Sequence, residues 1–593
     1  MIELLPEHVA NQIAAGEVIQ RPASAVKELL ENAIDANSTK IQLIVKNAGS
    51  SLVQVIDNGL GMNKKDAGMA FKKHATSKIK SADDLFNISS KGFRGEALSS
   101  IAAVGHVELK TRSSDDDVGT QILIEGSEIT KNESIACSLG TSISMKNLFF
   151  NVPARRNFLK SNAVETKHII DEFHRAAMAH PEVHFTMHHN DNLVFDLPKG
   201  NRRQRIVSIF GKKYNERLVP VEENTSISKI SGFVLKPEFS KRTRGEQFIF
   251  INNRFIKSNS LNHAINFVFK DLISKEHFPS YFLYIEVPTN SIDVNIHPTK
   301  TEIKFEDERA IYTMVKSCVR NSLGKYNVAP TIDFEQESSF DLPPIKAGTT
   351  ISAPTIKVNP DYNPFQKQNT DRVEENLDLL KSNFQTELNQ LDTGGNENTS
   401  ESNFNVPNTN LFIQFKKRYL LTVKKKGIII VDIFRAHQQI KYEELINHYE
   451  NAEVIAQKLL HPLEVDLSSS DIQLCLEIKD ELLRLGVEVD QFGKDSIVVN
   501  SFPVNAEKLD GKAFIEACIE SFKHENKEFD NPYMKLAWGI ASNYAHSRLK
   551  AMENKEMSHL MDCLFSCQSP TTNAKGLSII EEINETEIIN KFK

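Results

Sequence analysis

A polar segment between residue 331 and about residue 405 most constrains how this chain can fold. Stretches such as LPPIKAGTTISAPTIKVNPDYNPF and LDTGGNENTSESN are rich in Pro, Ser, Thr, Asn and acidic residues, and their few apolar residues follow no helical or strand period. Such a composition is typical of a disordered linker. A chain of 593 residues is also too long for one hydrophobic core. The sequence therefore predicts folded regions on both sides of a long flexible tether.

Composition limits the classes of protein to which the chain can belong. A formal net charge of −7 excludes a uniformly basic nucleic-acid coat but leaves room for a local basic groove. The six cysteines are sparse, which favours reduced thiols over a disulfide framework. The start, MIELLPEHVANQIAAGEV, has acids where a signal peptide needs bases, and no apolar run reaches membrane-spanning length. We expect a cytoplasmic protein with no membrane partner.

The stretch KELLENAIDANS at residues 27–38 concentrates acidic side chains in one predicted helix. Its apolar residues recur at helical spacing, which predicts an amphipathic helix. Glu28, Asn32 and Asp35 stand at i, i+4 and i+7 and therefore share a face, where like charges repel unless a cation lies nearby. Two interpretations follow: a solvated face, or a magnesium ion held together with a nucleotide. The neighbouring segments must decide between them.

The next segment, KIQLIVKNAGSSLVQVIDNGLGM, predicts two strands joined by a turn that contains glycine. Val53, Val55 and Asp57 share one face of the second strand, so the pattern aims a carboxylate toward the interior. A buried acid needs a hydrogen-bond donor, and the exocyclic amine of adenine would serve. Gly59 and Gly61 would allow the backbone to approach a ligand closely, although DNG is also an ordinary turn sequence.

A third segment, KGFRGEALSSIAAV, places Gly92 and Gly95 directly before a predicted helix. Glycine-rich backbone ahead of a helix N-terminus presents free N–H groups to phosphate. The G-x-x-x-x-G-K-[ST] pattern of a P-loop is absent from the sequence. The polar, basic stretch FKKHATSKIKSADDL lies between these glycines and the strands, and we expect it to form a mobile lid.

Together, KELLENAIDA, DNGLGM, GFRGEALSS and GTSISMKNLFFNVPARRNFL resemble the GHKL ATPase superfamily of gyrase, heat-shock chaperones and histidine kinases. Within it, ANQIAAGEV, HATSKI, GFRGEAL and NVPARRNFL resemble the MutL family of DNA mismatch repair proteins over about residues 1–330. The resemblance implies an α+β fold: a Bergerat-type ATPase sandwich, with a mostly antiparallel sheet under helices, followed by an α/β transducer domain. It also implies ATP and Mg²⁺ as cofactors.

The resemblance assigns roles residue by residue. Glu28 matches the general base that activates water, Asn32 the magnesium ligand, and Asp57, with Gly61 beside it, the acid that binds adenine. The other ATP-binding residues that it implies are Gly92, Arg94, Gly95, Leu98, Thr141 and Lys300, the last reaching the γ-phosphate from the transducer. The lid would contain His74, Thr76, Ser77 and Lys78. Glu31 is expected to be only a solvated neighbour.

Basic residues gather between residues 155 and 257, where the resemblance places a DNA path. Those expected to contact DNA are Arg155, Arg156, Lys241, Arg242, Arg244, Arg254 and Lys257, and the basic group also includes Lys160, Arg202, Arg203, Arg205, Lys212 and Lys213. Such binding would be led by the phosphate backbone, independent of sequence and strongly salt-dependent. The alternative is a solvated surface over core aromatics, because Phe248, Phe250 and Phe255 are interleaved with these residues.

The region after the linker resembles the C-terminal part of the family, whose endonuclease branch carries a metal site. Asp432, His437, Glu443 and Cys567 match ligands of that site and define a remnant site, but Phe434, Gln438 and Ser569 stand where further ligands are expected. Losing these ligands should cost a transition-metal site most of its affinity. The segment AQKLLHP, with Gln457, Leu459 and Leu460, resembles a sliding-clamp contact or is an ordinary strand entry.

The sequence thus predicts an ATPase domain at 1–205, a transducer at 206–330, a linker at 331–405 and a dimerisation domain at 406–593 with an inserted lobe at about 456–530. The resemblance implies a weakly ATP-hydrolysing, ATP-gated homodimeric clamp or matchmaker between mismatch recognition and strand removal, in a nucleoid-associated, bacterial-type setting. Its expected partners are DNA, the mismatch-recognition protein MutS, a sliding clamp, a helicase and a nuclease. The alternatives are a metal-dependent nicking endonuclease with a divergent C-terminal site, and a chaperone or topoisomerase subunit, against which GFRGEAL and NVPARRNFL argue.

Overall fold

The computed structural model describes most of the chain outside the predicted linker. The described residues are 7–78, 91–92, 95–241, 246–274, 277–293, 301–326, 412–424, 427–451, 456–493, 496–503, 511–523, 529 and 531–590. The predicted linker at 331–405 lies outside these ranges, as do Arg94, Arg242, Arg244, Lys300 and the part of the predicted lid after Lys78. None of the described helices is long and apolar enough to cross a membrane.

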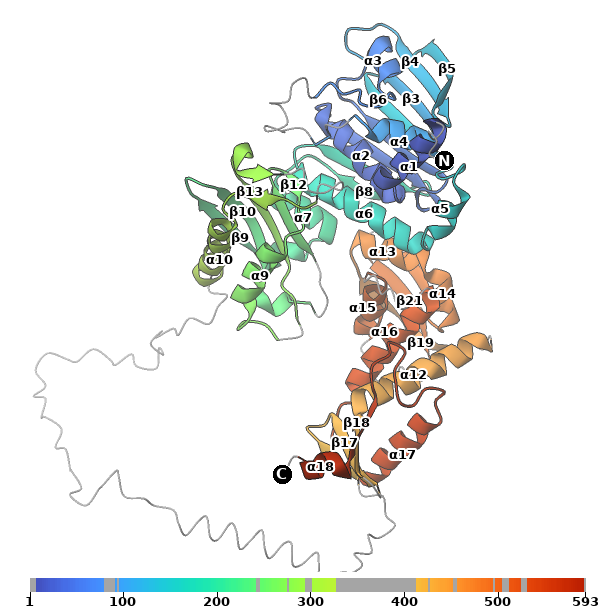
Figure 1. Cartoon of the computed structure of the whole chain (residues 1–593), viewed down its shortest axis with the longest axis vertical. Helices are drawn as coiled ribbons and strands as arrows, with labels where there is room; N and C mark the ends of the chain where they lie inside the picture. The colour runs from blue at the N-terminus through green and yellow to red at the C-terminus, as the bar shows by residue number, and fades with distance from the viewer. Residues whose placement is uncertain are drawn as a thin grey trace, which may run out of the picture. The chain divides into compact units, whose positions relative to one another are not determined.

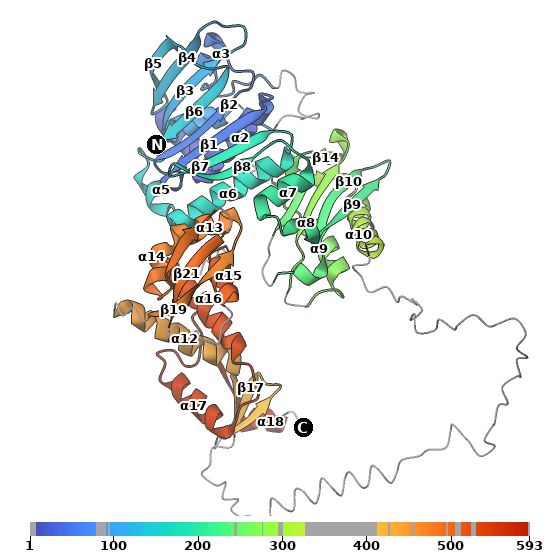
Figure 2. The same cartoon turned by 180° about the vertical axis from the view of Figure 1, so that it is seen from behind.

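The first region is built on an eight-stranded sheet in the order β5-β4-β3-β6-β2-β1-β7-β8 (Figure 1). The strands are β1 Lys40–Lys46, β2 Leu52–Asp57, β3 His106–Arg112, β4 Gly119–Glu125, β5 Glu128–Ile135, β6 Gly140–Lys146, β7 His184–His189 and β8 Asn192–Leu197. All neighbouring strands pair antiparallel except β1 and β7, which are parallel and are seen side by side in Figure 2. The expected mostly antiparallel sheet is confirmed.

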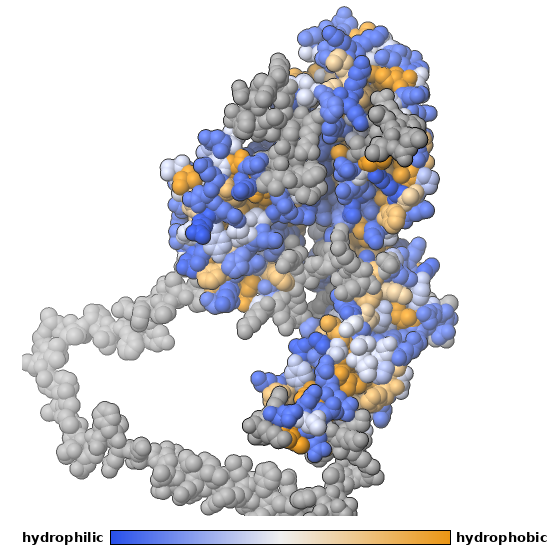
Figure 3. All heavy atoms as spheres, viewed as in Figure 1, coloured by the Kyte–Doolittle hydropathy of each residue, from blue (hydrophilic) through white to orange (hydrophobic). Residues whose placement is uncertain are grey.

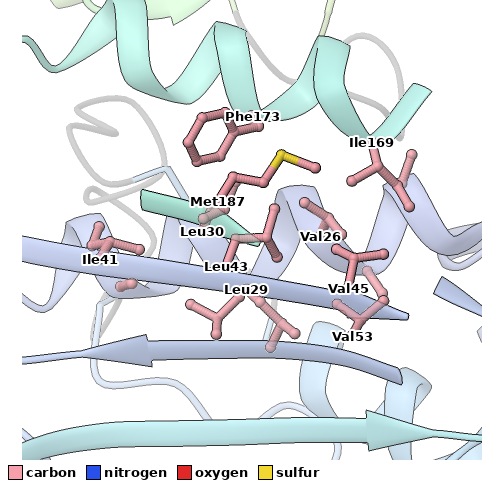
Figure 4. Packing of buried hydrophobic residues seen from close by; sticks show 14 of the residues in the cluster. Val26, Leu29, Leu30, Ile41, Leu43, Val45, Val53, Ile169, Phe173 and Met187 are labelled. Carbon is pink, nitrogen blue, oxygen red and sulfur yellow. The ribbon is translucent and has the colours of Figure 1, made fainter. Parts of the chain in front are cut away.

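Helices pack on this sheet because their apolar stripes match its buried strand positions. They are α1 Glu7–Val18, α2 Pro22–Asp35, α3 Lys64–Met69, α4 Ala97–Val104, α5 Pro153–Phe158 and α6 Asn162–Ala179. Helix α2 begins with Pro22, whose fixed φ suits a first helical position, and it buries Val26, Leu29 and Leu30. These side chains pack with Leu43 and Val45 of β1 and with residues of α6 such as Phe173 (Figure 4). The apolar face of α2 therefore fixes where its polar face points.

The second region has a five-stranded sheet in the order β12-β11-β13-β10-β9. Its strands are β9 Leu218–Asn224, β10 Lys229–Leu235, β11 Gln247–Ile251, β12 Arg254–Phe255 and β13 Tyr281–Glu286, with a separate pair β14 Ile292–Asp293 and β15 Lys304–Phe305. Its helices are α7 Arg202–Phe210, α8 Tyr214–Arg217, α9 Asn259–Phe269 and α10 Glu308–Lys325. Phe250, Phe282 and Tyr284 are buried in the same core as the first sheet. The two sheets therefore share apolar packing.

The region after residue 411 contains two smaller sheets. The first, β16-β17-β18-β22, consists of β16 Phe412–Phe415, β17 Tyr419–Lys424, β18 Gly427–Asp432 and β22 Ile580–Asn584; the second, β19-β21-β20, of β19 Ala456–Asp466, β21 Ser496–Pro503 and β20 Val489–Phe492. The helices are α12 Ile433–Glu450, α13 Ser469–Glu477, α14 Lys479–Arg484, α15 Gly511–Lys523, α16 Pro532–Ser547, α17 Asn554–Phe565 and α18 Glu585–Asn590. The mixed helix and sheet content confirms the predicted fold class.

Helix α7 crosses the predicted boundary at residue 205. Its Ile206 and Ile209 are buried in the core of the first region, so the helix packs there although most of the following residues belong to the second sheet. The predicted domain boundaries stay predictions. On the face shown in Figure 3, polar residues predominate and apolar residues form small patches.

Candidate nucleotide site

The polar face of α2 is fastened to two segments that lie far along the chain. Asp35 accepts hydrogen bonds from the backbone N–H groups of Lys91 and Gly92, both at 3.1 Å, one on each carboxylate oxygen. It also pairs with the ammonium group of Lys78 at 2.6 Å. One carboxylate thus ties the end of α2 to the glycine-containing loop and to the predicted lid.

Asn32 and Asp35 together already surround a positive charge. The Nζ atom of Lys78 donates to Asn32 Oδ1 at 3.2 Å as well as to Asp35 Oδ2. Amide and carboxylate oxygens are the donor types that Mg²⁺ prefers. Glu28, one turn before Asn32 on the same helix, is half-buried. The residues present therefore fit a hydrated divalent ion beside Asn32, where a lysine ammonium now stands.

Asp57 lies at the end of β2 and points inward, as its alternation with buried Val53 and Val55 predicts. Its Oδ1 accepts hydrogen bonds from Ser38 Oγ at 3.1 Å and from the Gly59 N–H at 2.8 Å. Burial raises the pKa of Asp57 above its ordinary value, whereas these two hydrogen bonds and one from the backbone of Thr141 lower it. The carboxylate is thus a partly desolvated acceptor held in a fixed position.

Two glycines allow neighbouring backbone segments to approach closely at this end of the sheet. Gly61 has a φ of +67°, and a Cβ there would stand 2.0 Å from the carbonyl oxygen of Arg112. Gly140 has a φ of +107°, and a Cβ there would stand 2.2 Å from the carbonyl oxygen of Asp57. Any other residue would therefore force the strand ends apart. The predicted Gly61 and Thr141 both lie at this closely packed end of the sheet.

Ser38 and Thr111 also belong to this site, and the sequence interpretation did not include them. The hydroxyl oxygen of Thr111 lies 3.0 Å from that of Thr141 and accepts a hydrogen bond from the Met62 N–H at 2.9 Å. Ser38 follows the acidic helix by three residues, which is a local signal that could have been used. The position of Thr111 depends on the pairing of β3 with β6, for which the local sequence gives no signal.

The glycine-containing loop leads into α4, as predicted. Gly95 has a φ of +64°, and a Cβ there would stand 2.5 Å from the Ala75 carbonyl oxygen. The His74 N–H donates to the Gly95 carbonyl at 3.1 Å. Leu98, in the first turn of α4, packs against the main core, so this turn is anchored. The start of the predicted lid and the glycine-containing loop are therefore in direct contact, near Asp35.

The predicted solvated role of Glu31 is wrong. Its side chain lines a small cavity together with Lys91 and Arg254, and its Oε2 atom is buried. Helical periodicity placed Glu31 away from the apolar face, but it could not foresee that Lys91 and the second sheet would cover it.

The basic residues expected at DNA have different environments. Arg156 and Lys257 are exposed, whereas Lys241 pairs with Glu246 at 2.7 Å. The guanidinium of Arg155 lies against Gly16 of α1, where an added Cβ would clash with it, and Arg254 donates to the Lys91 carbonyl at 3.4 Å. The DNA contacts stay predictions.

One member of the basic group is structural. Arg205 is only 2% exposed and donates to the carbonyl oxygens of Ala177 and Val183 at 3.2 and 2.7 Å, so a role at a DNA surface is wrong for it. The interleaved phenylalanines pack on one another, with ring centroids about 6 Å apart between Phe248, Phe250 and Phe255. They are core aromatics, as the alternative interpretation held.

The remnant metal site of the C-terminal region is not assembled. Asp432 caps α12 by accepting from the Arg435 N–H at 3.2 Å, and it pairs with Arg418 at 3.4 Å. Glu443 accepts the N–H groups of Gln568 and Ser569 at 2.6 and 3.0 Å. Within the described ranges, no three His, Cys, Asp or Glu side chains form a group that could hold a metal ion. The four predicted residues are therefore not gathered into a metal site in the structure, and their role as a remnant site stays a prediction.

Of the other two remnant residues, Cys567 is poorly suited to binding metal, whereas burial keeps the imidazole of His437 in the neutral form that binds metal. Burial lowers the pKa of His437 to about 4 and raises the pKa of the Cys567 thiol to about 12. A thiol with so high a pKa resists the deprotonation that metal binding needs. Phe434 packs on the ring of His546 with 4.6 Å between centroids, so His546, too, contacts an apolar ring.

The predicted sliding-clamp segment lies on β19. Its pairing with β21 shifts register between Lys458 and Leu463, and Leu460, inside this irregularity, is 91% exposed. An isolated, fully exposed leucine in a bulged strand is compatible with a contact to another protein. Gln457 pairs with Phe502 of β21, as the strand-entry alternative predicts.

One face of the β16-β17-β18-β22 sheet is apolar and partly exposed. We call it the open sheet face; strand register places these residues on it: Ile413, Phe415, Tyr419, Leu421, Val423, Ile428, Ile430 and Ile583. The opposite face carries Leu420 and Val431, which are fully buried against α17. On the open sheet face, Phe415 and Val423 are 52% and 64% exposed. An exposed apolar face of this kind is typical of a surface that binds another protein.

Comparisons with known families cover the three regions in turn. A model described as histidine kinase-, DNA gyrase B- and HSP90-like ATPase matches residues 20–148. A model of the C-terminal domain of DNA mismatch repair protein matches residues 206–324, and a model of the MutL C-terminal dimerisation domain matches residues 412–553.

Individual relatives match this chain along its whole length. The DNA mismatch repair proteins MutL of Christiangramia forsetii and Flavobacterium psychrophilum are each 43% identical, over 624 and 614 residues, covering 100% of this chain and 99% of their own length. Among solved structures, the crystal structure of the N-terminal domain of a DNA repair protein is 26% identical with a TM-score of 0.48, covering 54% of this chain and 99% of that one.

Proposed function

Because the chain belongs to the MutL family of DNA mismatch repair proteins, we propose that it binds and hydrolyses ATP between α2, the end of β2 and the Gly92 loop, and that ATP gates a dimeric clamp. The observation that carries this proposal is the set of hydrogen bonds that joins Asp35 to Lys78, Lys91 and Gly92. These hydrogen bonds bring the predicted lid, the glycine-containing loop and the acidic helix α2 together around one site. A purified chain that fails to hydrolyse ATP with Mg²⁺ present would contradict the proposal.

Each residue of the site has a distinct task. Asp57 accepts a hydrogen bond from the adenine amine, and the backbone amides of Gly95 and Leu98 face the phosphates. Glu28 orients and deprotonates the attacking water, as a general base does. Asn32 holds Mg²⁺, which when bound neutralises charge on the phosphates. Catalysis of phosphoryl transfer needs little beyond such positioning.

Lys78 links occupancy of the site to the lid. Its ammonium bridges Asn32 and Asp35 in the structure, so it must leave Asn32 before that amide can hold a metal ion. Displacing Lys78 frees the start of the lid from α2. Binding of nucleotide with its metal thus favours a rearranged lid, which is the differential contact that a two-state switch requires.

The clamp would act on DNA and on other repair proteins. We propose that exposed basic residues such as Arg156 and Lys257 contact the DNA backbone, and that the closed dimer passes the signal from MutS to a helicase and a nuclease. Leu460 is offered as the sliding-clamp contact, because it is an apolar side chain that is 91% exposed. The open sheet face is assigned to the constitutive dimer.

We expect Val423→Asp to separate the constitutive dimer, because pairing would bury an unpaired carboxylate on the open sheet face. Leaving a charge buried and uncompensated costs about 3 kcal/mol or more, which weakens association by about 100-fold or more. Sedimentation equilibrium of the full chain measures this. The matched control is Leu483→Asp, at a leucine 48% exposed on α14. If Val423→Asp leaves the dimer as tight as the control does, the face is wrongly assigned.

We expect no nicking of supercoiled DNA by the purified chain with manganese, even with ATP and a loaded sliding clamp. Asp432 is held by Arg418 and Arg435, and the described side chains bring no three ligands together. Agarose-gel conversion of supercoiled to open-circular plasmid is the readout. Nicking that disappears in Asp432→Asn would contradict this expectation and place the chain in the endonuclease branch.

A further inference from the structure

Lys91 makes a contact for which the chemistry of the nucleotide site has no use. Its backbone N–H donates to Asp35, but its side chain runs to the second sheet, where Nζ donates to the backbone carbonyl of Asn253 at 2.6 Å. The backbone is tied to the same place, since Arg254 donates from Nη2 to the Lys91 carbonyl at 3.4 Å. Both the side chain and the backbone carbonyl of Lys91, the residue directly before Gly92, are therefore hydrogen-bonded to the second sheet.

The partner of Lys91 lies on a rigid part of the second sheet. Strands β11 and β12 pair Ile251 with Arg254, which leaves Asn252 and Asn253 as a two-residue turn. Both have positive φ, 49° and 60°, as a type I′ hairpin turn requires. The Asn252 side chain donates to the Val287 carbonyl and accepts from the Val287 N–H, both at 2.9 Å, which fixes the turn beside the end of β13. The Asn253 carbonyl thus cannot move without the hairpin.

The Lys91 side chain is partly buried. It borders a cavity of about 40 Å³, and the charged residues around this cavity are Lys27, Glu31, Glu172, Arg175 and Arg254. Burial lowers the pKa of Lys91 to about 8; the carboxylates of Glu31, Asp35 and Glu182 oppose this effect, and the guanidinium of Arg254 adds to it. Lys91 therefore loses its proton at a lower pH than an ordinary lysine does.

We propose that Lys91 is a positioning residue that couples the glycine-containing loop to the β11–β12 hairpin, so that nucleotide bound on the first sheet alters the second. The inference rests on the proposed nucleotide site. A loop that shifts when phosphates bind at Gly92 carries the preceding residue with it, and a charge-assisted hydrogen bond transmits that shift to the Asn253 carbonyl. Lys91 contacts neither adenine nor phosphate in this account, so its removal should change nucleotide affinity only by the small coupling free energy that it carries.

The test is hydrogen–deuterium exchange of the full chain with and without a non-hydrolysable ATP analogue, read in peptides covering residues 247–262. In the unmodified chain the analogue should slow exchange there. In Lys91→Met that difference should be lost, while affinity for the analogue changes by less than about threefold. Lys65→Met, at an exposed lysine on α3, is the matched control and should behave as the unmodified chain does.

Lys91→Arg and pH give a second readout that a merely structural residue would not change. The cavity leaves room for the larger guanidinium, which stays charged, so Lys91→Arg should keep the hairpin response at both pH 7 and pH 9. The unmodified chain should lose most of the response at pH 9, with labelling times scaled for intrinsic exchange.

The outcomes separate this inference from the proposed function. An unmodified chain that does not bind the analogue would overturn the nucleotide site itself. Binding with an unchanged hairpin response in Lys91→Met would overturn only the coupling role. So would loss of analogue binding in Lys91→Met, because the inference gives Lys91 no part in holding nucleotide.

Discussion

Glu28→Ala should lower the ATP hydrolysis rate of this chain by about 10²- to 10⁴-fold, the range expected when a general base is removed. ATP affinity should stay nearly unchanged. The reason is that Glu28 acts on the attacking water, whereas ground-state binding depends on Asp57, Asn32 and the loop at Gly92. An interaction made only in the transition state lowers turnover without weakening binding of the substrate.

The measurement pairs single-turnover hydrolysis with equilibrium binding of a fluorescent ATP analogue. Glu128→Ala, the same change at an exposed glutamate on β5, is the matched control and should hydrolyse ATP normally. Hydrolysis by Glu28→Ala at the unmodified rate would show that another residue activates the water. Loss of binding together with hydrolysis would instead place Glu28 in nucleotide contact.

Asp57→Asn should remove most of the affinity for ATP. The asparagine side chain can present its NH₂ group where the adenine amine needs an acceptor. It also cannot carry the charge that strengthens the hydrogen bond to adenine. Hydrogen bonds to charged groups contribute about 1.5–3 kcal/mol, so the loss should be roughly 10- to 150-fold. Titration calorimetry of the full chain gives the affinity directly.

The same substitution should not destabilise the fold through loss of charge. Burial raises the pKa of Asp57, so the carboxyl is easier to protonate in the folded than in the unfolded chain, and the contribution of this group to stability increases as pH falls. An uncharged asparagine avoids the cost of burying the carboxylate, so thermal unfolding should occur no earlier than in the unmodified chain near pH 7. Unchanged ATP affinity in Asp57→Asn would refute its assignment to adenine.

Much of the site could be predicted because its signals are local. Alternation over residues 52–57 gave β2 and the inward direction of Asp57, and helical spacing in α2 gave the shared face of Glu28 and Asn32. Both periods reflect burial of one side of an element, which is set by its own residues. The two glycines before α4 were likewise visible as a break before an apolar helix.

The contacts of Asp35, Lys91 and Glu31 could not be predicted in this way. Asp35 meets Lys91 across 56 residues of chain, and Lys91 meets Asn253 across 162. Periodicity identifies a polar face but not which distant segment will cover it. Glu31 was therefore expected in solvent, although it lines the cavity beside Lys91.

In the C-terminal region, a recognisable ligand pattern did not predict the contacts that its residues make. Asp432, His437 and Glu443 resemble the ligand pattern of the family, yet two of these side chains have other partners: Asp432 pairs with arginines, and Glu443 accepts hydrogen bonds from the backbone of Gln568 and Ser569. The positions of these residues in the sequence show which of them could meet at a metal ion. The ligands that the sequence lacks determine whether they do.

The central claim is that ATP, held between α2, β2 and the Gly92 loop, closes a dimer that opens again after hydrolysis. Sedimentation velocity of the full chain tests it most directly, because closure makes the dimer more compact and raises its sedimentation coefficient. We predict a rise with a non-hydrolysable ATP analogue in the unmodified chain and with ATP itself in Glu28→Ala, and no rise with ADP or in Asp57→Asn. A sedimentation coefficient of the unmodified dimer that is the same with the analogue as with ADP would contradict the claim.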